Sequence, residues 1–252
     1  MTFPPDSLAY KMIELPGVGA LRAFDFMTSV STDNRDVLNA DSIEFCNLLK
    51  KNWGVFRDEY LQLLDQKKLY NVKDFYKVRY DVKHDENWQM FPLLLFNYRF
   101  IENTAKCIGS FELIKQIPGC TTAMFSVLGP GKHVPPHRGI YKGTYRCLLG
   151  LIVPDEEKCW IKINGKKMPF REGECMVFDE TFEHEAANES DLPRIVLYLD
   201  IYRKLPFPVN MLNDMLFYSL RKSPFIQNVL NEYRKLDSAT FENFIPKAAL
   251  LR

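Results

Sequence analysis

The sequence predicts a mainly β protein of the jelly-roll type with helical elaborations. Short segments of strand character follow one another between residues 120 and 203, and Gly and Pro residues separate them. One of the separations is Asn164-Gly165, a pair of residues that strongly favours a β-hairpin. Helical periodicity appears on both sides of this region. We therefore expect one domain over residues 1–252, with an N-terminal helical or irregular part (1–118), a β core (119–205) and C-terminal helices (206–252).

Two helices are predicted early in the N-terminal part. Asp41, followed three positions later by Glu44, has the pattern of a capping box that opens a helix ending at about Lys51. A second helix carries an aromatic and aliphatic stripe at helical spacing, which is typical of a core-facing side. The stripe consists of Trp53, Phe56, Tyr60 and Leu63. A further helical stretch at 110–117 ends before Pro118-Gly119.

The β core contains both alternating and continuously apolar segments. Residues 122–128 and 159–163 alternate, which predicts strands with one buried face. Residues 145–154 form a continuous apolar run, which is typical of a strand buried on both faces. Further strands are expected at 167–170, 174–179 and 194–202, and two helices follow after Pro206 and Pro208.

The composition is that of an ordinary globular enzyme, with 46% hydrophobic and 26% charged residues. Lys and Arg number 33 against 32 Asp and Glu, so no overall charge favours nucleic acid or a membrane. The apolar runs are shorter than the ~20 residues that span a bilayer, and the first residues lack the pattern of a secretory signal. The six cysteines are scattered without CxxC spacing. We expect a cytoplasmic protein with reduced thiols.

Three of the four histidines lie in the strand-rich region, in two unusual local contexts. His133 and His137 flank two prolines, which exclude the helical pair of a zinc site and instead stiffen an extended segment. His184 follows a strand, and on an extended chain Glu183 and Glu185 point away from it. Neutral imidazole is a common ligand of iron(II), and the usual oxygenase site adds a carboxylate two residues after the first histidine. That position is Gly139, so the spacing alone leaves structural histidines as an open alternative.

Three stretches resemble one known family with steady spacing over about a third of the chain. They are FSVLGPGKHVPPHRG, YRCLLGLIVP and REGECMVFDETFEHEAANESDLPRIVLYLDI. Together they are similar to the aspartyl/asparaginyl β-hydroxylases, a family of iron(II) and 2-oxoglutarate-dependent oxygenases that includes lipid A hydroxylase-like members. The resemblance implies a double-stranded β-helix core of the jelly-roll or cupin-like kind, which agrees with the strand pattern.

The resemblance also implies a set of site residues. His137 and His184 would bind the iron, and the missing carboxylate at Gly139 is a trait of the family. Arg194 would grip the distal carboxylate of 2-oxoglutarate, a task that suits a planar guanidinium. Ser126 would support that carboxylate and Arg146 would lie near the keto-acid end. We thus expect a dioxygenase that uses Fe(II), 2-oxoglutarate and O2, with His137, His184 and Arg194 as its catalytic residues.

Two other functions stay open. Iron and 2-oxoglutarate-dependent halogenases also lack the carboxylate, so Gly139 would leave room for chloride. A non-catalytic jelly-roll binding module is the third interpretation, although it has no need of Arg194, Ser126 and Arg146 together. One departure from the family concerns the carboxylate end. Its animal members carry a histidine where this chain has Leu148, which argues against transferring their peptide substrate.

The substrate is the least determined feature. Basic residues around the first histidine, namely Lys132, Arg138, Lys142 and Arg146, indicate an anionic substrate, with a solvated loop as the alternative for Lys132 and Lys142. Trp88 borders either the pocket or the core. The expected reaction is hydroxylation of an unactivated C–H bond in an amino-acid-like, carrier-bound or acyl substrate. The segment RKSPFIQNVLNEYRK either contacts an anionic membrane or a carrier protein peripherally, or braces the fold.

Overall fold

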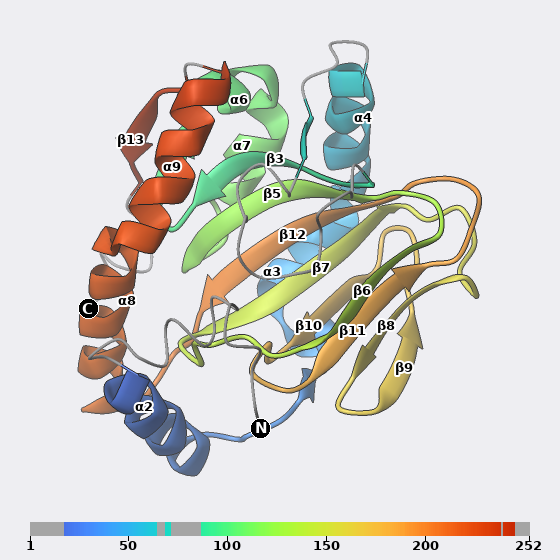
Figure 1. Ribbon diagram of the computed structural model, residues 1–252. Coiled ribbons are helices and arrows are strands. Elements are labelled where there is room, and N and C mark those ends of the chain that lie inside the picture. Colours follow the sequence, from blue (N-terminus) through green and yellow to red (C-terminus); the bar gives the residue numbers. More distant parts are fainter. Residues whose placement is uncertain (1–17, 65–68, 72–86, 238, 245–252) are drawn as a thin grey trace.

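Two antiparallel sheets dominate the computed structural model, which describes residues 18–64, 69–71, 87–237 and 239–244 (Figure 1). In the described residues the larger sheet has nine strands in the order β1-β10-β7-β12-β5-β3-β4-β13, with β2 paired to β3. The smaller sheet has the order β6-β11-β8-β9 and lies against one face of the larger one. The chain is thus mainly β, with the jelly-roll core that the sequence predicts.

The strands of the larger sheet are β1 (Val37–Leu38), β2 (Tyr70–Asn71), β3 (Trp88–Leu95), β4 (Tyr98–Phe100), β5 (Cys120–Leu128), β7 (Thr144–Ile152), β10 (Cys175–Phe178), β12 (Arg194–Tyr202) and β13 (Phe241–Asn243). Those of the smaller sheet are β6 (Lys132–His137), β8 (Cys159–Ile163), β9 (Lys166–Pro169) and β11 (His184–Asn188). The predicted turn at Asn164-Gly165 joins β8 to β9, and both residues have positive φ, 48° and 82°. This confirms the hairpin.

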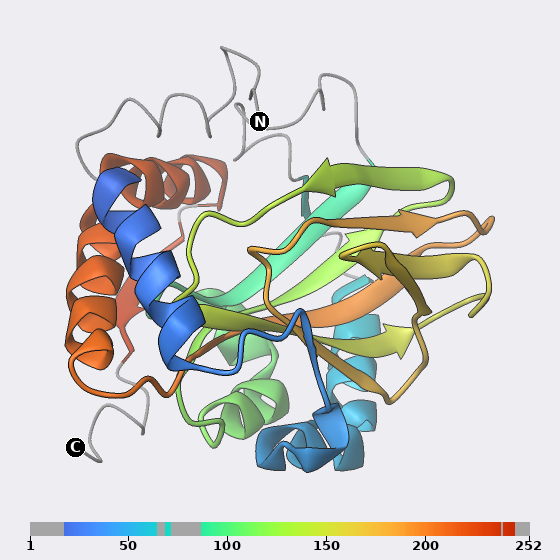
Figure 2. The same cartoon turned by 90° about the horizontal axis from the view of Figure 1, so that it is seen from below.

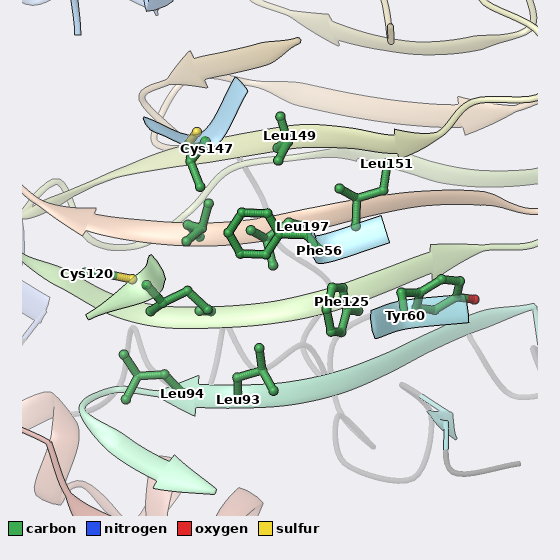
Figure 3. Close-up of a cluster of buried hydrophobic side chains, with 14 of the residues drawn as sticks. Phe56, Tyr60, Leu93, Leu94, Cys120, Phe125, Cys147, Leu149, Leu151 and Leu197 are labelled. Atoms are coloured by element: carbon green, nitrogen blue, oxygen red, sulfur yellow. The ribbon is translucent and has the colours of Figure 1, made fainter. Parts of the chain in front are cut away.

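Helices cover the face of the larger sheet that points away from the smaller one (Figure 2). They are α3 (Glu44–Lys51), α4 (Trp53–Leu64), α6 (Ile101–Lys106) and α7 (Ile108–Ile114). The predicted stripe of α4 is confirmed, because Phe56, Tyr60 and Leu63 are buried, and the Tyr60 and Phe125 ring centroids lie 5.7 Å apart (Figure 3). Since the central strands β5, β7 and β12 contribute Phe125, Leu149 and Leu197 to the same cluster, this face holds the main core.

Three helices pack at one end of the sheets, namely α2 (Val18–Ser31), α8 (Val209–Lys222) and α9 (Pro224–Asp237). In α9 the side chains of Ile226, Leu230 and Tyr233 are buried, and the Tyr233 ring meets Phe100 edge-on at 5.0 Å between centroids. Of the two interpretations for this segment, the structure therefore supports bracing of the fold. In the part of the chain that the structure describes, no helix is long and apolar enough to cross a bilayer.

The predicted capping box is wrong. Asn39 caps a short 3-10 helix at Ala40–Ser42, and α3 then begins at Glu44 with Ile43 as its N-cap and no side-chain cap. Asp41 lies within the 3-10 turn, where its carboxylate accepts a hydrogen bond from Lys50 at 2.7 Å. The pattern Asp-x-x-Glu is present, but the Asp41 N–H donates to Asn39 Oδ1 in a separate 3-10 turn, so Asp41 does not cap α3.

Four described strands come from the N-terminal part of the chain, where we expected only helices and irregular segments, namely β1, β2, β3 and β4. All four belong to the larger sheet, because β1 pairs with β10, and β3 pairs with β2, β4 and β5. β13 comes from the part where we expected C-terminal helices, and it pairs with β4. β5 is also buried along its whole length rather than on alternate positions, because helices cover one of its faces and the smaller sheet the other. That residues 1–252 form a single domain stays a prediction.

Candidate active site

A cavity of about 230 Å³ lies between the two sheets. Side chains of the central strands alternate, so that every second residue of β5, β7 and β12 points into it and the others point into the core. On β12, for example, Arg194, Val196 and Tyr198 line the cavity, whereas Leu197 and Leu199 belong to the main core. The opposite wall comes from β6, β8 and β11 of the smaller sheet.

His137 and His184 face each other across β6 and β11. They are register partners of this antiparallel pair, and their ring centroids lie 4.1 Å apart. Each Nδ1 lies within hydrogen-bond distance of a backbone carbonyl two residues earlier, 2.8 Å to Pro135 O and 2.9 Å to Phe182 O. Because a carbonyl only accepts, both Nδ1 atoms carry the proton and both Nε2 atoms keep a lone pair. This is how proteins orient histidines that bind a metal.

Arg194 places a buried cation at the cavity. The residue is 5% exposed, its guanidinium lies 4.4 Å from the centroid of the Phe170 ring, and its Nε and Nη1 have no hydrogen-bond partner in the described structure. Burial lowers the pKa of Arg194 to about 10. A buried guanidinium without a carboxylate is costly, so this group is suited to an anion that enters the cavity.

Ser126 and Trp88 lie beside Arg194 on the larger sheet. Ser126 pairs with Val196 and Arg194 pairs with Leu128, so Ser126 and Arg194 are diagonal neighbours on one face. The indole N–H of Trp88 donates to Ser126 Oγ at 3.2 Å. With its oxygen accepting from Trp88, the Ser126 hydroxyl is left to donate its own proton. Trp88 lines the cavity and also packs against a core cluster that includes Met90 and Met124, so it borders both the pocket and the core. A contact between Trp88 and the substrate stays a prediction.

Arg146 belongs to a buried network of charges at the cavity wall. Its Nε and Nη2 both donate to Asp200 Oδ1 at 3.0 Å, and its Nη1 pairs with Glu180 at 2.5 Å. Burial disfavours the charge of Arg146, but the two carboxylates outweigh it and raise its pKa above the usual value. Burial also raises the pKa of Asp200 to about 6, although Arg146 opposes this. Sequence reasoning missed Glu180 and Asp200.

Glu180 occupies the space that a side chain at position 139 would need. The Gly139 N–H donates to the Glu180 carbonyl at 2.7 Å, and a Cβ on Gly139 would collide with the Cγ and Cδ of Glu180. A carboxylate therefore lies next to the place where the usual oxygenase ligand begins, but it comes from the segment before His184. The one feature of the sequence that could have pointed to Glu180 is its position four residues before His184.

Other residues considered at the sequence level lie elsewhere. Arg138 reaches Glu183 at 3.8 Å and does not line the cavity, so the expected substrate contact finds no support there. His133 is half exposed and lies 2.8 Å from Glu185. Lys142 is neither solvated nor at the cavity, because it is buried and donates to Asp179 at 2.6 Å. His84 falls outside the described residues.

A separate group of metal-ligating side chains lies on the other face of the larger sheet. The sulfur atoms of Cys46, Cys147 and Cys175 all lie within 4.8 Å of one another. All three are free thiols that pack into the main core, beside Leu149 of β7. This group shares no residue with the cavity.

Comparison with known proteins identifies the family. Residues 50–204 match the family model described as aspartyl/asparaginyl beta-hydroxylase. The chain is 33% identical over 204 residues to an ornithine lipid ester-linked acyl 2-hydroxylase of Rhizobium tropici, covering 80% of this chain and 73% of that protein. It is 29% identical over 168 residues to the human aspartyl/asparaginyl beta-hydroxylase, covering 63% of this chain but only 21% of the human protein.

Among solved structures, a cupin domain of a transcriptional regulator from Enterobacter cloacae covers 47% of this chain and is itself covered in full, at 13% identity and a TM-score of 0.33. The two facing sheets with a cavity between them define a cupin-like jelly-roll protein. Within that class, the chain belongs to the aspartyl/asparaginyl β-hydroxylase family, which is a family of hydroxylases.

Proposed function

We propose that this protein is an iron(II) and 2-oxoglutarate-dependent dioxygenase that hydroxylates an unactivated C–H bond of an acyl-type substrate. One observation carries the proposal. The cavity lined by His137 and His184, whose ring centroids lie 4.1 Å apart, is also lined by the buried Arg194, whose Nε and Nη1 have no hydrogen-bond partner in the described structure. A metal-binding pair and an anion-binding cation in one cavity match the needs of a dicarboxylate that also chelates a metal.

The residues of the chain divide the work between them. His137 and His184 would hold the iron through Nε2, because Pro135 O and Phe182 O fix their tautomers. Arg194 would bind the distal carboxylate of 2-oxoglutarate, and Ser126 would donate its hydroxyl proton to the same group. Bound iron, 2-oxoglutarate and O2 together supply the oxidising power that breaks the C–H bond. The protein supplies position and excludes water.

The expected role of Arg146 at the keto-acid end stays a prediction. Its guanidinium is already engaged by Asp200 and Glu180, so it would act on the cosubstrate only while keeping these partners. We propose that the network holds Glu180 beside the metal-binding pair. Leu148, which lines the cavity in place of a histidine, leaves this wall less polar than in the animal relatives.

An acyl substrate fits the other end of the cavity. Phe96, Ile140, Phe217 and Leu220 line it there and pack in one apolar cluster around α8. Such a wall binds methylene groups and offers no partner for a second charged group. The relative from Rhizobium tropici is named for hydroxylation of an ester-linked acyl chain, which supports the same substrate class.

The arrangement around Gly139 supports hydroxylation over halogenation. A halogenase needs an anion site beside the metal, but the Glu180 side chain already lies against Gly139. A chloride there would meet a like charge in a buried place, which is unfavourable. The non-catalytic binding module is also a poorer explanation, since simple binding needs no metal pair beside a buried cation.

Succinate release tests the proposal. The protein is incubated in air with Fe(II), ascorbate and 2-oxoglutarate, with and without acyl lipids, and the lipids are examined for a mass gain of one oxygen atom. We expect succinate from the wild type and from His133→Ala, and none above background from His184→Ala or Arg194→Ala. Equal succinate from all four proteins, or none from the wild type despite bound metal, would refute the proposal.

A further inference from the structure

Helix α8 has two apolar sides that point in opposite directions. On its inner side Phe217 and Leu220 line the catalytic cavity. On its outer side Met211, Met215 and Tyr218 follow one another at positions i, i+4 and i+7, and all three are exposed. A helix on the surface of a globular protein normally carries charged or polar residues on its outer side. The outer side of α8 therefore has the character of a binding surface.

The neighbouring elements extend this apolar surface. Helix α2 lies beside α8 in both views (Figures 1 and 2), and the two share an apolar cluster beneath them. Exposed apolar side chains stand on α2 and in the segment just before α8, where Phe207 is 77% exposed. We define the docking face as Phe26, Val30, Phe207, Met211, Met215 and Tyr218. Contiguous exposed apolar groups of this kind mark interaction sites.

The net charge around the docking face is basic. The exposed ionic side chains of residues 18–31 and 204–222 are Arg22, Lys204 and Lys222, and all are basic. The two acids of these segments are half-buried and engaged. Asp25 accepts from the backbone N–H of Lys142, and Asp214 accepts from the Tyr202 hydroxyl at 2.8 Å. Just beyond α2 the exposed acid Asp33 pairs with Arg35, so it adds no net negative charge there. An apolar face whose surrounding net charge is basic is complementary to a surface that is negatively charged and apolar beneath.

We propose that the docking face binds the surface of an anionic lipid bilayer, with its apolar side chains in the headgroup region and its basic residues against lipid phosphates. No helix of the described chain crosses a bilayer, so the contact is interfacial. Docking brings the bilayer to one side of α8 while the cavity lies on the other. An acyl chain then has a short path to the metal-binding histidines, a consequence that rests on the proposed function.

Co-sedimentation with vesicles tests the docking face. Large vesicles of phosphatidylcholine alone are compared with vesicles that also contain phosphatidylglycerol, using the full chain and two matched variants. Met215→Glu changes the docking face, whereas Ile108→Glu changes a residue of equal exposure on α7, 63% against 64%. We expect the wild type and Ile108→Glu to bind the anionic vesicles, and Met215→Glu to bind about tenfold more weakly or worse, since an apolar contact becomes a repelled charge.

Three outcomes would overturn the inference. The first is that the wild type does not bind the vesicles, and the second is that both variants bind equally. The third is that the wild type sediments as a dimer and Met215→Glu as a monomer, which would mean that a second copy of the chain covers the docking face. Succinate formation without lipid separates this inference from the proposed function, because Met215→Glu should leave it unchanged. Vesicle binding by a wild type that forms no succinate would refute the proposed function and leave the docking face intact.

Discussion

Replacing Arg194 by methionine should make the ligand-free protein more stable. Burial lowers the pKa of Arg194 from 12.5 to about 10, and each pKa unit corresponds to about 1.4 kcal/mol. The buried cation therefore costs about 3 kcal/mol at every pH below about 10, and this cost disappears as the pH rises toward 12.5. Methionine loses the contact with Phe170, which contributes about 1 kcal/mol. We expect a net gain of about 1–2 kcal/mol in the free energy of unfolding.

The same substitution should abolish the response to 2-oxoglutarate. Breaking a buried charge pair by removing one partner costs about 2–5 kcal/mol of binding free energy, so the affinity should fall by about thirtyfold to several thousandfold. A ligand at a hundred times its Kd stabilises a protein by about 2.7 kcal/mol. Added 2-oxoglutarate should thus stabilise the wild type and leave Arg194→Met almost unchanged.

Thermal unfolding with and without 2-oxoglutarate, in the presence of redox-inert Mn(II), measures both effects. For a chain of this size 1 kcal/mol corresponds to about 2–4 °C in Tm. The control is Arg171→Met, because Arg171 is exposed and pairs only at the surface with Glu156, and it should behave like the wild type. An Arg194→Met variant that unfolds at a lower temperature and still gains stability from 2-oxoglutarate would refute the reasoning.

Three further predictions concern the other parts of the site. His184→Ala should weaken Mn(II) or Fe(II) binding by about a hundredfold in an anaerobic titration, whereas His133→Ala should not, because His133 lies outside the cavity. Gly139→Ala should lower the free energy of unfolding by about 1–3 kcal/mol in urea, since its Cβ collides with Glu180. Because burial raises the pKa of Asp200 to about 6, the folded state holds that proton more tightly than the unfolded chain. The free energy of unfolding should therefore fall as the pH rises from about 4 to 6, and Asp200→Asn should remove that part of the dependence.

The parts of the fold with a strong local signal were predictable from the sequence. The stripe Phe56, Tyr60 and Leu63 has helical spacing, and Asn164-Gly165 admits few structures other than a tight hairpin. The strand β3 was harder, because a strand buried on both faces shows a continuous apolar run that periodicity does not distinguish from other core segments. Its pairing with β5 is a contact between distant parts of the chain.

The site was predictable in its residue types but not in its charge network. His137, His184 and Arg194 stand in local sequence patterns, and the resemblance to a family gave each of them a role. The register of β6 with β11 places His137 opposite His184, which is compatible with a shared metal ion. The ion pairs of Arg146 with Glu180 and Asp200 join three strands or loops that are distant in sequence. Strand alternation tells which face a side chain is on, but not which partner it meets across the sheet.

A crystal structure of the protein grown with Mn(II) and 2-oxoglutarate tests the central claim most directly. The predicted result is one metal ion bound by the Nε2 atoms of His137 and His184, with the distal carboxylate of 2-oxoglutarate on Arg194 and the hydroxyl of Ser126. A cavity without metal or cosubstrate, or a metal held instead by Cys46, Cys147 and Cys175, would contradict it.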